Sequence, residues 1–172
     1  KKNIQINFTL SQKAMHFTHI PKKYLQKKLW TLPVCLKWGQ KEADPIETCV
    51  LLEHEQQRFK TRLPQKPTWV HPNIHQKGLY YWSLDQQDYQ KLFSQAQLNH
   101  AEWSSLVDLT LSLVLAQELE VKTYLNTLDK FALRSFNPIT LSLLFEHFNH
   151  VVHFFGNSKK GDLVSQWVST IL

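Results

Sequence analysis

The spacing of apolar residues changes near residue 86, and this change requires two kinds of secondary structure in succession. Before residue 86, apolar side chains recur at every second position, as in strands with one buried face. After it, they recur every three or four residues, as on one side of a helix. The sequence therefore predicts an α+β chain in two segregated parts. Residues 1–85 are expected to form an all-β sandwich domain, and residues 86–172 an antiparallel, solenoid-like α-helical array.

The first part contains several short alternating segments separated by turn-forming proline pairs. Strands are expected over residues 4–10, 32–38, 48–52, 57–63 and 78–84. Pro33 cannot donate a hydrogen bond within a sheet, so its strand is expected to lie at an edge or to carry a bulge.

The second part carries helix-start signals. Asp85 can cap a first helix, and Asn99 followed by Glu102 has the spacing of a capping box. Asn137-Pro138 marks another helix start, and its apolar face is expected to include Leu144, Phe148, Val151 and Val152.

A last helix opens at Asp162 and stops at Leu172 without a capping residue. It is expected to be truncated and to leave an apolar patch that includes Trp167 or Val168. Weak self-association through that helix follows from such a patch.

Charge is distributed unevenly along the chain. Residues 1–85 hold 14 Lys and Arg against 6 Asp and Glu, whereas the whole chain has a net charge of +6. A basic half suits either an anionic partner or a solvated surface that discourages edge-to-edge strand pairing. The lysine pairs lack the aromatic residues of a base-stacking groove, so the solvated surface is favoured and no nucleic-acid partner is expected. No apolar run reaches the roughly 18 residues of a membrane segment.

The two cysteines are too few for a disulfide scaffold. A hairpin that turns near Glu42-Ala43 would place Cys35 opposite Cys49. Because directly opposite cysteines are bridged only in strained geometry, both are expected to be buried free thiols.

The nearest approach to a catalytic motif is the run from His54 to Arg58. A zinc peptidase needs histidines at the first and fifth positions of one helical face, and Arg58 cannot ligate zinc. His147, His150 and His153, beside Glu146, could share a metal, but no further ligands complete a site, and ordinary helix histidines are favoured. No catalytic residue, metal site or cofactor is therefore expected within this chain.

Four runs of residues carry a family resemblance. They are Phe8-Thr9-Leu10-Ser11-Gln12-Lys13 with Phe17, Trp30-Thr31-Leu32-Pro33, Trp69-Val70-His71-Pro72-Asn73, and Gly78-Leu79-Tyr80-Tyr81-Trp82-Ser83-Leu84-Asp85. In this order they resemble the l-x-x-Q-x-x-F, W-x-I-P, w-x-x-x-N and G-y-Y-R-v-x-Y-d motifs of aminopeptidase N-type zinc metallopeptidases. The matched positions are interpreted as structural: Gln12, Phe17, Trp30, Pro33, Trp69, Asn73, Gly78, Tyr80 and Asp85.

The resemblance implies that the chain is the third, β-sandwich domain of such a peptidase plus the start of its helical domain. The zinc-bearing catalytic domain would lie upstream and be this chain's partner, with peptides as the parent's substrate. There the sandwich acts as a spacer, and the helices form a bowl that shapes substrate access. Tyr81 and Leu84 depart from the arginine and tyrosine usual in the family, which implies a divergent parent.

Two other classes of function remain open from the sequence. A free-standing sandwich module for protein interaction would show a contiguous exposed apolar patch. A basic nucleic-acid-binding β-barrel would show lysines converging on one aromatic face.

Overall fold

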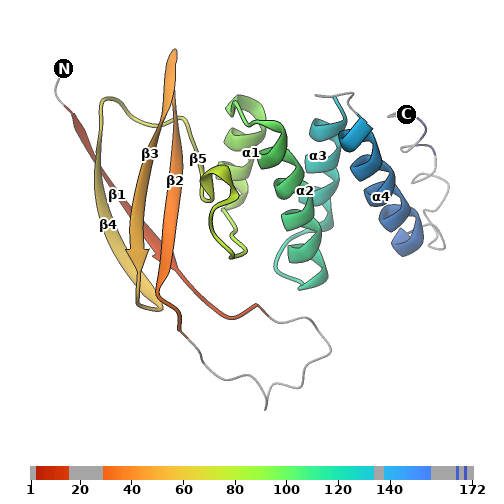
Figure 1. Ribbon diagram of the computed structural model, residues 1–172, viewed down its shortest axis with the longest axis horizontal. Helices are drawn as coiled ribbons and strands as arrows, with labels where there is room; N and C mark the ends of the chain where they lie inside the picture. Colours follow the sequence, from red (N-terminus) through yellow and green to blue (C-terminus); the bar gives the residue numbers. More distant parts are fainter. Residues whose placement is uncertain (1–2, 16–28, 134–137, 156–165, 167–168, 170–172) are drawn as a thin grey trace.

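A computed structural model describes residues 3–15, 29–133 and 138–155, together with Gln166 and Ser169. Strands occupy the first part of the described chain and helices the second, so the predicted α+β class is confirmed (Figure 1). The strands are β1 (Ile4–Ser11), β2 (Leu32–Gln40), β3 (Ala43–Leu52), β4 (Gln56–Leu63) and β5 (Trp69–His71). After a short 3-10 helix, η2 (Ile74–Gln76), come α1 (Gln86–Gln95), α2 (His100–Leu115), α3 (Val121–Ala132) and α4 (Pro138–Phe155).

The described strands form two separate antiparallel sheets and do not close into a barrel. β1 pairs with β4 in one sheet, and the other has the order β3-β2-β5. Phe8 of β1 contacts Trp38 of β2 edge to face, with ring centroids 5.2 Å apart, so apolar side chains join the two sheets. The buried residues of this first core are Val34, Leu36, Trp38, Leu52 and Leu63.

A second core continues from β5 into the helices. Ring contacts lead from His71 through Trp82, Tyr89 and Phe93 to Trp103, with centroid distances between 5.0 and 6.5 Å. This chain of aromatic rings crosses the position where the apolar spacing changes. The strands and the helices therefore share buried contacts at their junction.

Pro33 lies within the middle strand of the three-stranded sheet. β5 pairs only with Lys37–Gly39 of β2, so beside Pro33 only β3 is paired among the described strands. The register also shifts between Trp38 and Gln40. Pro33 is thus tolerated because no described strand needs its missing N–H group.

The prediction of a strand over residues 78–84 is wrong. These residues follow a path without regular secondary structure, although α1 does begin directly after Asp85 as predicted. Both backbone polar groups of Gly78 bind the side chain of Asn73, at 2.9 Å each. Because a side chain satisfies these groups, they are not available to a neighbouring strand.

The expectation of two free thiols is also wrong, because Cys35 and Cys49 form a disulfide. The predicted register is confirmed, since Cys35 lies directly opposite Cys49 in the β2–β3 pair. Their Cα atoms are 4.0 Å apart, as in the narrow pairs of an antiparallel ladder. That close approach brings the two sulfur atoms within bonding reach.

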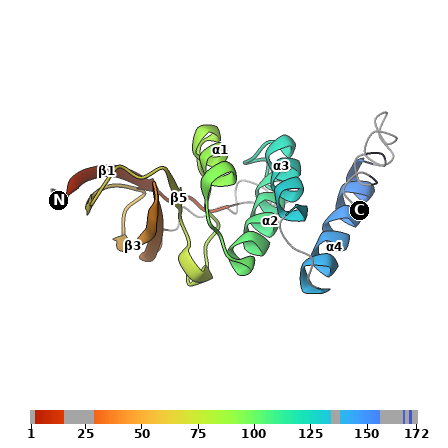
Figure 2. The ribbon, with the colours of Figure 1, turned by 90° about the horizontal axis from the view of Figure 1, so that it is seen from above.

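The helix starts predicted after Asp85 and Asn99 are found in the structure, and α4 begins at Pro138 as expected. Asp85 accepts a hydrogen bond from the Asp88 N–H group at 2.8 Å, and Asn99 and Glu102 form a complete capping box. The helices α1 to α4 follow one another in a row away from the sheets (Figure 2). In α4, Leu144, Phe148 and Val151 are buried, whereas Val152 is exposed, contrary to expectation.

The predicted last helix, from Asp162 to Leu172, lies outside the described residues apart from Gln166 and Ser169, which are both helical and exposed. The expected patch at Trp167 or Val168 therefore lies outside them as well. Within the described part of the chain, no helix is long and apolar enough to cross a bilayer.

Candidate functional site

The run from His54 to Arg58 does not lie on a helix. His54 and Glu55 occupy the turn between β3 and β4, and Arg58 lies within β4. These side chains therefore lack the single helical face that a zinc peptidase motif needs. Across the described ranges, no group of three or more His, Cys, Asp or Glu residues could hold a metal ion.

Gln12 joins three segments of the chain. Its side-chain N–H group donates to the carbonyl oxygens of Trp30 at 2.8 Å and His54 at 3.2 Å, and its Oε1 accepts from the Trp30 N–H group at 2.9 Å. Its backbone N–H group also donates to the Glu55 carbonyl oxygen at 2.8 Å. Gln12 thus fixes the end of β1 against the start of β2 and the β3–β4 turn.

A second group of motif residues fixes the backbone between β5 and α1. Asn73 holds Gly78 through two hydrogen bonds, and the Tyr80 hydroxyl donates to the Pro72 carbonyl oxygen at 2.8 Å. A Cβ atom at Gly78 would lie 1.9 Å from the Tyr80 ring. Glycine is required there by close approach, and not by its φ angle, which is not positive.

The other motif positions have separate environments. Trp69 is buried against Gly39, where a Cβ atom would lie 1.9 Å from the indole ring. Trp30 and Pro33 are exposed, and Asp85 caps α1. Phe17 lies outside the described residues.

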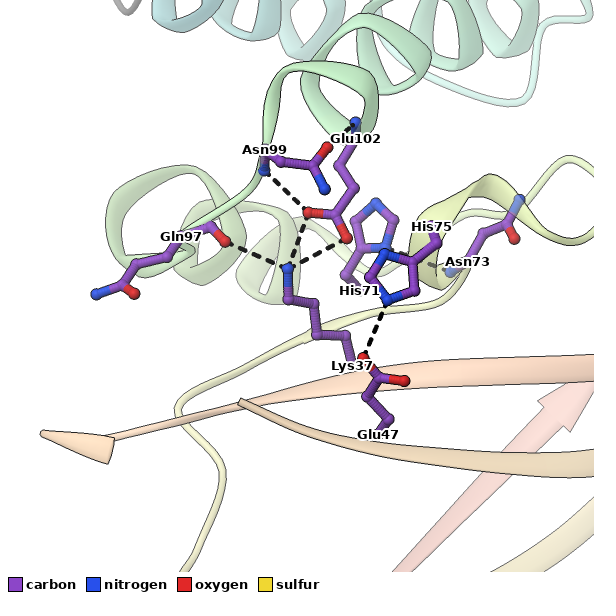
Figure 3. A network of polar contacts seen from close by, with 8 residues as sticks. All are labelled: Lys37, Glu47, His71, Asn73, His75, Gln97, Asn99 and Glu102. Atoms are coloured by element: carbon purple, nitrogen blue, oxygen red, sulfur yellow. Dashed lines mark hydrogen bonds and ion pairs between the residues drawn. The ribbon is translucent and has the colours of Figure 1, made fainter. Parts of the chain in front are cut away.

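A buried ion pair lies where the three-stranded sheet meets α2 (Figure 3). Lys37 Nζ is 2.9 Å and 3.1 Å from the two carboxylate oxygens of Glu102, and it also donates to the Gln97 carbonyl oxygen at 3.3 Å. The same carboxylate accepts from the Asn99 N–H group at 3.0 Å. Burial alone would raise the pKa of Glu102, but the hydrogen bonds from Lys37 and Asn99 outweigh it and hold that pKa below its usual value.

His71 lies beside this pair, opposite Lys37 in the β2–β5 register. It is fully buried, and its Nδ1 accepts a hydrogen bond from the Asn73 N–H group at 3.4 Å. Its Nε2 has no hydrogen-bond partner among the described residues. Burial lowers the pKa of His71 to about 4; the charge of Glu102 opposes this shift and that of Lys37 adds to it.

A further polar chain connects three helices. His147 of α4 contacts Asp108 of α2 through Nε2 at 3.0 Å and the Tyr124 hydroxyl of α3 through Nδ1 at 3.0 Å. Burial, followed by the charge of Asp108, raises the pKa of Tyr124. His147 therefore serves as a hydrogen-bonded core residue, while His150 and His153 lie nearer the surface of α4.

Sequence reasoning identified Glu102 and His147 but missed their partners, Lys37 and Asp108. The partners are distant along the chain: Lys37 and Glu102 are 65 positions apart, and Asp108 and His147 are 39 positions apart. Neither partner belongs to a local motif.

A groove of about 1030 Å³ runs between the end of β1, the start of β2 and residues 79–85. Leu79 and Tyr81 are exposed along its edge. Four carboxylates line its wall. Asp85 caps α1, Asp88 pairs with Lys91, Glu118 pairs with Lys13, and Glu55 lies in the β3–β4 turn. No histidine or cysteine is among the described residues of this wall, so they supply no imidazole base for a nucleophile.

Comparison with known proteins gives no match, either to a protein family or to a curated protein.

Proposed function

We propose that this chain is the non-catalytic part of an aminopeptidase N-type zinc metallopeptidase, whose parent removes N-terminal residues from peptides. In this role the strand region spaces the catalytic domain from the helices, and the helices shape access for the peptide. The basis is the resemblance of the four runs between Phe8 and Asp85, in their order, to motifs of that family.

One observation supports this proposal most strongly. The motif residues Gln12, Asn73, Gly78 and Tyr80 hold backbone segments together, and Asp85 starts the first helix. Residues that fix backbone geometry are the ones that a shared scaffold must keep, because few other side chains make the same bonds.

The finer architecture belongs to the same proposal. The two sheets form a sandwich, which the contact between Phe8 and Trp38 supports. The helices form a stacked array, which the packing of α2 against α3 and of α4 against both supports.

Zinc would be held by the catalytic domain outside this chain. The described residues do not fit a zinc site, because no suitable group of ligands occurs among them. No catalytic step is therefore assigned to these residues.

Two measurements test the proposal. Transcripts that encode this chain are sequenced upstream of the Lys1 codon, and an in-frame His-Glu-x-x-His motif is expected. The purified chain is assayed with aminoacyl anilides and analysed for metal, and neither hydrolysis nor stoichiometric zinc is expected. A transcript that encodes this chain without that motif would overturn the proposal. So would one tightly held zinc that is lost on substituting His147 and His150.

A further inference from the structure

The outer face of the β1–β4 sheet is polar and carries a row of three cations. Side chains alternate strictly between the two faces of this sheet, and those on the outer face are all exposed. The outer residues of β1 are Gln5, Asn7, Thr9 and Ser11. Those of β4 are Gln56, Arg58, Lys60 and Arg62.

The positive charge of this face is not balanced within the sheet. Neither β1 nor β4 contains an aspartate or glutamate. Arg58, Lys60 and Arg62 lie opposite Thr9, Asn7 and Gln5 respectively. In the described part of the chain, no ion pair to the three cations is found. The face thus carries a net charge of +3, and the side chains next to the three cations are uncharged and can form hydrogen bonds.

The position of the sheet leaves this face accessible. β1 and β4 lie at the end of the molecule opposite α4 (Figures 1 and 2). Their inner face packs on the other sheet through Phe8 and Phe59. The outer face is therefore free of described contacts with the helices.

We infer that this face binds an extended acidic peptide segment whose carboxylates occur at alternate positions. Cations two residues apart on a strand are spaced about 6.8 Å, because each residue rises about 3.4 Å. Alternate side chains of an extended peptide repeat at the same interval, so each carboxylate meets one cation. Arg58 and Arg62 suit carboxylates especially, since a guanidinium donates two parallel hydrogen bonds to one carboxylate.

The same face does not suit other anionic partners. It carries no aromatic side chain on which bases of a single strand could stack. It also carries no apolar side chain that could enter a lipid interface. The inference does not depend on the proposed peptidase role, because it rests only on the charge and the spacing of the side chains on this face.

The test measures how tightly the full chain binds a fluorescently labelled peptide of alternating Glu and Thr, with fluorescence anisotropy as the readout. The variant R58Q/K60Q/R62Q removes the row, and K77Q/K122Q/K130Q removes three exposed cations elsewhere as a matched control. We expect about tenfold weaker binding for the first variant and less than about twofold for the second. Unchanged thermal unfolding of both variants shows that folding is intact. A peptide of the same composition with its glutamates in one block should bind more weakly.

Three outcomes would overturn the inference. Equal loss in the two variants would mean that net charge, and not the row, attracts the peptide. Equal binding of the block peptide would remove the spacing argument. Tighter binding of oligothymidylate, or of vesicles that contain phosphatidylserine, through the same three residues would assign the face to a different class of partner.

Discussion

Lys37 and Glu102, which are 65 residues apart, form a buried ion pair with Nζ 2.9 Å from Oε2. The Glu102 side chain is 0% exposed and that of Lys37 13%. Glu102 is also the third helical residue in the capping box of α2. One carboxylate therefore starts a helix and holds that helix against β2.

Breaking this ion pair should destabilise the protein strongly. Lys37→Met leaves a buried carboxylate without its cation, so we expect the free energy of unfolding to fall by about 3–5 kcal/mol. Urea denaturation followed by circular dichroism measures this change.

The double variant K37M/E102L provides the control. It removes both charges together, so its loss should be clearly smaller than the sum of the two single losses. Additive losses, or a loss below about 1 kcal/mol for Lys37→Met, would show that the pair is not coupled in solution.

Acid should destabilise the fold through His71. The pKa of this imidazole is about 4 in the folded chain, against 6.5 as its ordinary value, mainly because of burial. Between these values the unfolded chain binds a proton that the folded chain does not. The neutral His71 side chain therefore contributes about 3 kcal/mol to the free energy of unfolding. This contribution is fully present above pH 6.5 and is lost as the pH falls to about 4.

This contribution is measured as the difference in pH dependence between the natural chain and His71→Gln. The variant should lose less unfolding free energy between pH 6.5 and 4. His54→Gln, which makes the same substitution at an exposed position in the β3–β4 turn, is the control. Parallel curves for the natural chain and His71→Gln would contradict the buried neutral imidazole.

The sequence predicted those features that depend on neighbouring residues. The alternation from Ile4 to Leu10 matches β1, and the caps at Asp85 and Asn99 match the starts of α1 and α2. The prediction of a hairpin that places Cys35 opposite Cys49 is confirmed as well. In each case the physical cause lies within one strand, one turn of helix or one hairpin.

Features that depend on tertiary contacts were missed or predicted wrongly. The apolar pattern from Gly78 to Leu84 is typical of a strand, but the Asn73 side chain takes the hydrogen bonds of Gly78. The pairing of Lys37 with Glu102 leaves no trace in local spacing. Both features depend on side chains that bind groups elsewhere in the chain, and the spacing of apolar residues carries no information about such bonds.

The disulfide should contribute measurably to stability. Cys35 and Cys49 are separated by 14 positions, and closing a loop of this size stabilises a folded chain by about 3 kcal/mol. C35S/C49S should therefore unfold at lower urea concentration than the natural chain. Alkylation of the denatured, unreduced protein should label neither cysteine, and mass spectrometry would show two labels instead if the bond were absent.

Gly78→Ala should destabilise the segment between β5 and α1 through the Tyr80 ring. The added Cβ atom would lie 1.9 Å from Cε1 of that ring, whose hydroxyl is held by the Pro72 carbonyl oxygen. Moving the ring breaks this hydrogen bond, so we expect a loss of about 2 kcal/mol in urea denaturation. In a Tyr80→Ala background the ring is absent, and the added cost of Gly78→Ala should fall by at least about 1 kcal/mol. If Gly78→Ala costs the same in both backgrounds, backbone conformation is the reason for glycine at this position, and the contact with Tyr80 is not.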